Sequence, residues 1–326
     1  MYQSFYRLSE SPFELTSNPR FLFLTPRHRE ALSNLKYGLS AAKAVTLLLG
    51  EAGTGKTSLL RAALESDECR NVRCVFLHNC ALTRSEFLEI LAREFELGTR
   101  ASESKATLLG LLESHLRERR AAGQIAALIV DEAQGLSPDL LEEIRLLANI
   151  ETPNEKLLPL VLAGQPEFAT RLNEPDLRQL KQRVALRCEV VPFSLDETAA
   201  YVGTRVKVAG GDATRLFTRQ AVMLIHERSQ GIPRTINVIC DNALLSGFAL
   251  NRPLVDSEIV LEVCKDFDLR RRDGRGSGTM RRSAPEEVMK PPVALPPSLS
   301  PADPRRVHEG KAPEEWKAPV SGLSGR

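Results

Sequence analysis

The chain has 326 residues, of which 42% are hydrophobic and 26% are charged, a balance typical of soluble globular proteins. Its net charge of +2 argues against a protein coated with basic residues for nucleic acid. No apolar run approaches the roughly 18 residues that cross a bilayer, and the opening MYQSFYRLSESPF lacks the pattern of a signal peptide. We therefore expect a cytoplasmic protein without direct membrane insertion, with two or three domains.

Residues 1–43 show turn signals and then a helical pattern that begins at Pro26. Five apolar runs with strand character follow: Val45–Leu49, Val72–His78, Ile125–Val130, Leu158–Ala163 and Leu186–Val191. Helical patterns separate these runs along the chain. Runs that are apolar throughout and alternate with helices predict a parallel sheet covered on both faces, so residues 44–193 are predicted to form an α/β domain.

The strand signal stops after this domain. Residues 194–268 are predicted to form a small helical domain, with helices at Asp196–Val208, Thr218–Arg228, Arg234–Leu250 and Asp256–Phe267. Residues 269–326 differ in composition, because Pro285–Pro319 holds nine of the 20 prolines and the segment from Arg270 carries 12 basic against 7 acidic residues. Such a segment buries too little apolar surface to offset its ordering entropy, so we predict a disordered Pro-rich basic tail.

The strongest chemical signal is GEAGTGKT, which fits G-x-x-x-x-G-K-[ST] between an apolar strand and a helix. Its glycines let several backbone N–H groups converge on one anion, and the helix N-terminus adds partial positive charge. Lys56 is expected to reach the β/γ-phosphates of ATP, and Thr57 to offer its hydroxyl to Mg²⁺. A chance Gly-rich turn is the alternative, which the flanking strand and helix disfavour. The predicted nucleotide-binding residues of this loop are Gly50, Glu51, Ala52, Gly53, Thr54, Gly55, Lys56, Thr57 and Ser58.

Two adjacent acids end the buried run AALIVDEA. Asp131 is predicted to hold Mg²⁺ through its water shell, and Glu132 to act as general base toward the attacking water. The alternative is that the pair only caps the following turn. Acids at the end of a parallel strand lie at the ligand-binding edge of an open sheet, which favours the catalytic interpretation.

Two further polar residues follow the later elements. Gln165 ends the run LPLVLAGQ and could touch the γ-phosphate or the lytic water, although Gly-Gln-Pro is also a plain turn. Arg234 opens a helix in SQGIPRTIN, where its charge opposes the helix dipole. That mismatch favours a role in binding the nucleotide phosphates over a surface position.

Three arginines precede or enter the last strand: Arg178, Arg183 and Arg187. One of them could reach the nucleotide of a neighbouring protomer as an arginine finger, and we select Arg183. The alternative is a solvated basic face. The pattern alone does not distinguish the three.

These elements, in this order, resemble an AAA+ ATPase. The opening block MYQSFYRLSESPFELTSNPRFLFLTPRHREAL, then IVDEAQGL, IRLLANIET, LVLAGQPEF and GIPRTINVICDNALL are similar to the ExeA-like family, the general secretion pathway A ATPases. The family is in turn similar to transposition helper ATPases of the MuB and TniB type.

The resemblance implies a sheet of strand order 5-1-4-3-2 with a helical lid. It implies Gln165 as the first sensor and Arg234 as the second, and an N-terminal segment near the adenine with Phe13 and His28 as candidates. It also suggests that Asn79 restrains Glu132 until a partner binds. Members tied to type II secretion typically continue into a transmembrane helix and a periplasmic domain, whereas this sequence continues into the basic tail.

We therefore predict an ATPase that forms homo-oligomers and remodels a protein partner, in secretion or envelope assembly. The alternative is an ATP-dependent DNA-binding helper of the transposition type, for which the basic tail is the motivation and DNA a secondary partner. A third hypothesis is a nucleotide-dependent scaffold with negligible turnover. The acid at Glu132 and the candidate arginines argue against that scaffold.

Overall fold

The computed structural model describes residues 1–16, 18–78, 81–102 and 104–269. Residues 270–326 of the predicted tail and the candidate Asn79 lie outside these residues. The described strands are β1 (Val45–Gly50), β2 (Val72–Leu77), β3 (Ile125–Val130), β4 (Leu160–Gly164) and β5 (Val184–Val190).

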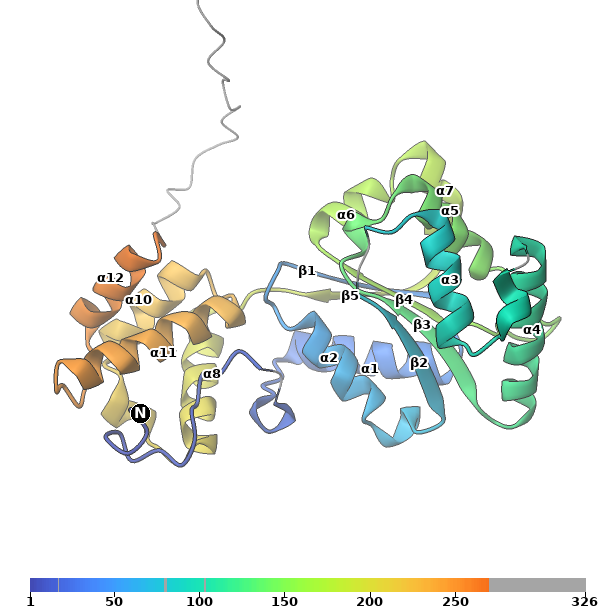
Figure 1. Ribbon diagram of the computed structural model, residues 1–326. Coiled ribbons are helices and arrows are strands. Elements are labelled where there is room, and N and C mark those ends of the chain that lie inside the picture. Colours follow the sequence, from blue (N-terminus) through green and yellow to red (C-terminus); the bar gives the residue numbers. More distant parts are fainter. Residues whose placement is uncertain (17, 79–80, 103, 270–326) are drawn as a thin grey trace, which may run out of the picture. The chain divides into compact units, whose positions relative to one another are not determined.

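The five strands form one parallel sheet in the order β2-β3-β4-β1-β5 (Figure 1). This is the predicted order counted from the other edge, so the prediction is confirmed. β1 is buried at all six positions and lies between β4 and β5. The loop that follows β1 therefore emerges at the middle of the carboxyl edge, where the ends of β3 and β4 also meet.

Within the described residues, seven α-helices belong to the α/β domain. They are α1 (Pro26–Ser40), α2 (Lys56–Leu64), α3 (Arg84–Glu94), α4 (Lys105–Ala121), α5 (Pro138–Leu147), α6 (Pro166–Arg171) and α7 (Arg178–Lys181). Alternate side chains of β1 enter two separate cores, because successive strand residues point to opposite faces. Leu48 packs with α1 and α2, whereas Leu47 and Leu49 pack with the helices from α3 onward.

The helical domain consists of α8 (Leu195–Val208), α9 (Ala213–Leu216), α10 (Arg219–Ser229), α11 (Pro233–Ala249) and α12 (Ser257–Asp266). A capping box starts α8, since Ser194 accepts a hydrogen bond from the Glu197 backbone and Glu197 accepts one in return. This lid has a core of its own that is rich in aromatic rings, including Phe193 and Tyr201. The fold class, an α/β sheet domain followed by a helical lid, is confirmed.

The N-terminal segment divides its contacts between the two domains. The Tyr2 hydroxyl donates to Asp241 and the Tyr6 hydroxyl to the Arg252 carbonyl at 3.2 Å, so the first residues pack on the lid. α1 then packs against β5 and α2. We name residues 1–25 the strap, because they run from the lid to the start of α1, near the β1–α2 loop (Figure 1). No helix within the described ranges is long and apolar enough to cross a membrane.

Candidate nucleotide site

The loop between β1 and α2 is shaped by two left-handed glycines. Gly53 has a φ of 82° and Gly55 a φ of 98°, conformations that residues with a Cβ rarely adopt. Gly55 is also the residue from which α2 starts, so the first N–H groups of that helix face the loop. Gly53 to Ser58 line a cavity, whereas the predicted binding residues Gly50, Glu51 and Ala52 are not among its lining residues.

Lys56 is buried and bonds to the loop itself. Its Nζ donates to the Gly50 carbonyl at 2.8 Å and to the Glu51 carbonyl at 3.2 Å. An ammonium can donate three hydrogen bonds, and the two formed here hold its charge on the concave side of the loop. The loop therefore holds a fixed cation where the converging N–H groups already favour an anion.

Thr57 and Asp131 meet across the gap between the loop and β3. The Thr57 hydroxyl donates to Asp131 Oδ2 at 2.9 Å, and Asp131 Oδ1 accepts from the Glu132 backbone at 3.0 Å. Both side chains thus present oxygens at one place. A hydroxyl beside a carboxylate matches the hard oxygen ligands that Mg²⁺ prefers, so this pair fits a magnesium site.

Glu132 has a left-handed backbone, with φ 55° and ψ 39°, although it is not a glycine. Such conformations in residues with a side chain cluster at functional sites. Its Oε2 accepts from Gln134 Nε2 at 2.5 Å and from Gln165 Nε2 at 3.3 Å. The tips of β3 and β4 are therefore joined through the carboxylate that we predict to be the general base.

The environment of Glu132 lowers the pKa of its carboxyl group. Partial burial alone would raise that pKa, but hydrogen bonds from Gln134 and Gln165 and the nearby charge of Lys56 outweigh it. The carboxylate is accordingly ionised at neutral pH. It can accept a proton there from an activated water.

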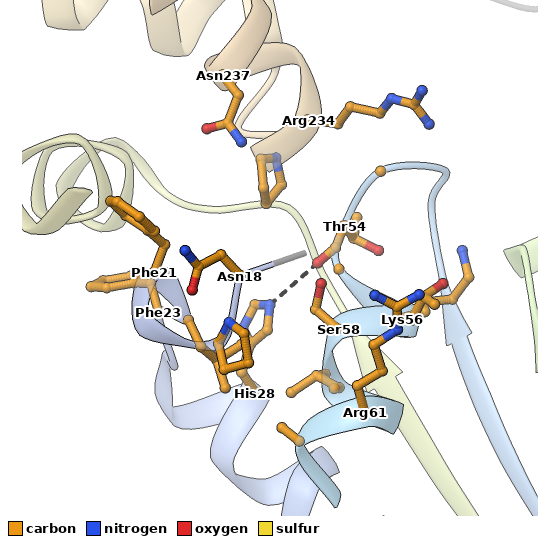
Figure 2. Close-up of a pocket in the computed structure, with 18 of the residues that line it drawn as sticks. Asn18, Phe21, Phe23, His28, Thr54, Lys56, Ser58, Arg61, Arg234 and Asn237 are labelled. Carbon is orange, nitrogen blue, oxygen red and sulfur yellow. Dashed lines mark hydrogen bonds between the residues drawn. The ribbon is translucent and has the colours of Figure 1, made fainter. Parts of the chain in front are cut away.

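A cavity of about 430 Å³ extends from the loop toward the strap and the lid. Figure 2 shows Asn18, Phe21 and Phe23 of the strap on one side and Asn237 of α11 on another, with the loop residues opposite. The aromatic rings give a flat apolar surface that suits a nucleobase, whereas the loop suits phosphates. The cavity thus has a phosphate end and an aromatic end.

Arg205 of α8 fastens the strap to the lid at the aromatic end. The buried guanidinium donates to the carbonyls of Pro12 and Glu14, the second at 3.3 Å, and to the Tyr201 hydroxyl at 3.0 Å. It also lies 4.7 Å from the centre of the Phe21 ring. One buried cation therefore positions both the strap backbone and an aromatic wall of the cavity.

His28 connects the strap to the phosphate loop. Its Nε2 lies 3.5 Å from the Thr54 carbonyl (Figure 2). Its Nδ1 lies 2.7 Å from the Thr25 hydroxyl. Because a carbonyl only accepts, Nε2 carries the proton and Nδ1 accepts from Thr25. Burial lowers the pKa of His28, so the ring is neutral at pH 7. Phe13, the other candidate of the strap, packs instead on Phe217 within the lid core.

Arg234 stands at the first turn of α11, directly against the phosphate loop. Its backbone N–H donates to the Gly53 carbonyl at 3.2 Å. A Cβ on Gly53 would lie only 2.8 Å from the Arg234 Cβ, so the glycine permits this approach. The side chain is exposed, lines the cavity and points away from Asn237 in Figure 2. The contact joins the lid to the loop through main-chain atoms.

The three candidate finger arginines lie away from this cavity. Arg178, Arg183 and Arg187 are exposed and belong to α7, the α7–β5 connection and β5. Val184 pairs with Val45, the first residue of β1, so Arg183 lies beside the amino edge of the sheet. The phosphate loop begins about 16 Å further along β1, at 3.3 Å per residue.

Several residues in or beside the cavity escaped the sequence reasoning. Gln134 lies inside the motif IVDEAQGL but received no role, because a glutamine after two acids carries no chemical signal of its own. Phe21, Tyr201 and Arg205 come from segments far apart in the chain. Only the FLF run in the strap hinted at an aromatic surface.

Comparisons with known proteins identify the family and the fold. A family model described as an AAA domain matches residues 40–172. General secretion pathway protein A of Aeromonas hydrophila is 42% identical over 249 residues, which cover 76% of this chain. The chain spans only 45% of the length of that relative.

Two solved structures share the fold. Cdc6p from Pyrobaculum aerophilum superposes with a TM-score of 0.62 at 21% identity, covering 78% of this chain and 70% of its own. The ORC2 protein of Aeropyrum pernix, solved in ADPNP–ADP complexes, gives 0.60 at 17% identity, with 79% and 72% covered. At these identities the likeness concerns the fold alone.

Proposed function

Because the chain is an ExeA-like AAA domain protein, we propose that it binds ATP with Mg²⁺ and hydrolyses it to remodel a protein partner. The observation that carries the proposal is the convergence of three groups at one edge of the sheet. These groups are the buried ammonium of Lys56, the oxygen pair of Thr57 and Asp131, and the carboxylate of Glu132. Cation, metal ligands and base are the parts that phosphoryl transfer to water requires.

Each residue has a separate task in this reaction. Lys56 exchanges its two carbonyl partners for phosphate oxygens, and the loop N–H groups hold the β-phosphate. Thr57 and Asp131 hold Mg²⁺, which when bound neutralises charge on the phosphates. Glu132 takes a proton from the attacking water, whose oxygen bonds to the γ-phosphorus as the bond to ADP breaks. Gln165 orients that water from the tip of β4, and Arg234 faces the phosphates from the lid.

Arg183 is proposed to act on the nucleotide of a second copy of this chain. It lies beside the amino edge of the sheet, so it is too far from the phosphate loop of its own protomer. Mixing Arg183→Ala with Glu132→Gln, each inactive alone, is expected to restore part of the ATPase rate, because mixed interfaces combine an intact base with an intact arginine. Mixtures that stay inactive at every ratio contradict this role.

The partner class follows from the relative. General secretion pathway protein A carries secretion in its name, so we propose a protein partner in secretion or envelope assembly. The DNA-binding alternative rests on the basic residues after Arg270. These lie outside the described part of the chain, so no contact in the structure favours it.

The decisive experiment replaces the proposed base and leaves the other residues of the nucleotide site unchanged. Glu132→Gln is expected to bind ATP as tightly as the wild type while the hydrolysis rate falls by roughly 10²–10⁴-fold, since the amide cannot accept the proton. Fluorescent-nucleotide titration and phosphate release measure the two quantities. Asp139→Asn, at an exposed acid on α5, is the matched control. Wild-type turnover in Glu132→Gln removes Glu132 as base.

A further inference from the structure

A hydrogen-bonded triangle joins the tips of β3 and β4. We name Glu132, Gln134 and Gln165 the glutamine clasp. Gln134 donates from Nε2 to Glu132 Oε2 at 2.5 Å and accepts at Oε1 from the Gln165 backbone at 3.0 Å. Gln165 closes the triangle with its own Nε2, 3.3 Å from the same carboxylate oxygen. The side-chain amide of Gln134 thus donates to Glu132, which follows β3, and accepts from Gln165, which follows β4.

The surroundings of Gln134 fix its place. Arg171 of α6 donates from Nη1 to the Gln134 carbonyl at 3.1 Å and to the Leu136 carbonyl at 2.6 Å, which holds the backbone of the β3–α5 connection. A Cβ on Gly164 would lie 3.1 Å from Gln134 Oε1. The absence of a side chain at Gly164 therefore gives the carboxamide room to lie over the end of β4.

We propose that Gln134 is a positioning residue, which holds the Glu132 carboxylate in the orientation that hydrolysis needs and ties it to Gln165. Both glutamines donate to Oε2 of Glu132. This leaves Oε1 as the oxygen that accepts a proton from water. The left-handed backbone conformation of Glu132 costs free energy, which the hydrogen bonds of the clasp offset. This inference rests on the proposed ATPase function.

The clasp also couples two parts of the reaction. Gln165 lies at the tip of β4 and is expected to orient the lytic water, so a displacement of β4 changes the hold on Glu132. Because Gln134 bonds to the Gln165 backbone rather than to its side chain, the coupling persists when the Gln165 side chain is replaced. Gln134, which no motif singled out, is the only described residue bonded to both Glu132 Oε2 and the Gln165 main chain.

Two substitutions separate positioning from space filling. Gln134→Met keeps the length of the side chain without a donor, and Gln134→Glu places a second negative charge beside Glu132. Both are expected to lower kcat about 10- to 100-fold, the cost of a misplaced catalytic group. KM for ATP and the Kd of a fluorescent ATP analogue should stay within about twofold, because no loop contact changes.

The control is Gln220→Ala, at an exposed glutamine on α10, which is expected to retain wild-type kinetics. Wild-type kcat in Gln134→Met means that the side chain only fills space, which overturns the proposal. The same holds if KM rises while kcat is unchanged. A fall of kcat together with a matching fall in melting temperature in both variants likewise assigns Gln134 a structural role.

A second measurement needs no turnover. In protein labelled with ¹⁵N-glutamine, Glu132→Ala is expected to shift the side-chain amide resonances of Gln134 and Gln165 and to leave that of Gln220 in place. An unshifted Gln134 resonance overturns the clasp. If the wild type hydrolyses no ATP, the proposed function fails, and the resonances then decide by themselves whether Gln134 holds Glu132.

Discussion

The phosphate end of the cavity and its aromatic end are held by contacts of different range along the sequence. Lys56 bonds to carbonyls five and six residues away, so the loop is shaped largely by its own residues. Arg205 bonds to carbonyls 191 and 193 residues away, so the aromatic end exists only when strap and lid meet. The predicted phosphate site is therefore shaped locally in the sequence, whereas the predicted nucleobase site depends on tertiary structure.

The substitution with the largest expected effect removes the cation at the phosphate end of the cavity. Lys56→Ala should weaken ATP and inorganic triphosphate alike, by about 100-fold or more, because it removes a buried charge facing the phosphates. Competition against a fluorescent nucleotide measures both ligands. Lys265→Ala, at an exposed lysine on α12, is the control. Retained triphosphate affinity in Lys56→Ala would show that the loop does not bind phosphate through this residue.

Arg205→Met should act on the aromatic end alone. Loss of the guanidinium leaves two strap carbonyls and the Tyr201 hydroxyl without their donor. The free energy of unfolding should fall by about 2–3 kcal/mol and the melting temperature by roughly 5–10 °C. ATP affinity should fall about tenfold because Phe21 loses its support, while triphosphate affinity stays unchanged.

Arg215→Met is the matched control for that substitution. Arg215 is exposed and 3.6 Å from Asp212, an ion pair worth little in water. Equal losses of ATP and triphosphate affinity in Arg205→Met would contradict the separation of the two ends.

The smallest effect concerns pH. The folded-state pKa of His28 lies below its unfolded value, so the native protein binds fewer protons, and stability is complete above pH 6.5 and falls as the pH drops toward the folded pKa. Between pH 7.5 and 5.5, the free energy of unfolding of His28→Gln should fall by about 1 kcal/mol less than that of the wild type. Urea unfolding at both values measures it.

The same difference in range explains what the sequence could predict. The five strands and the loop Gly50–Thr57 follow from apolar runs and a short motif, each readable within a few residues. The strand order was implied by the resemblance to the ExeA-like family. Strand tips that carry Asp131, Glu132 and Gln165 meet because parallel strands end at one edge. The short helices α6 and α7, of six and four residues, were not predicted, because so few residues show no periodicity.

The aromatic end could not be predicted for a physical reason. Phe21 and Arg205 show nothing in their own neighbourhoods that indicates a shared contact, since a guanidinium stacked on a ring has no sequence spacing. The family resemblance made Phe13 a candidate, yet it lies in the lid core against Phe217. The roles assigned to Gln165, Arg183 and Arg234 stay predictions.

The strap has a consequence for synthesis on the ribosome. Tyr2 and Tyr6 reach their native partners only after Asp241 and Arg252 have been translated. At 5–20 residues per second, these rings wait roughly 10–50 seconds. During that interval the α/β domain can fold while the nascent aromatic residues remain available to chaperones. The strap can therefore dock completely only after the ribosome has translated the lid.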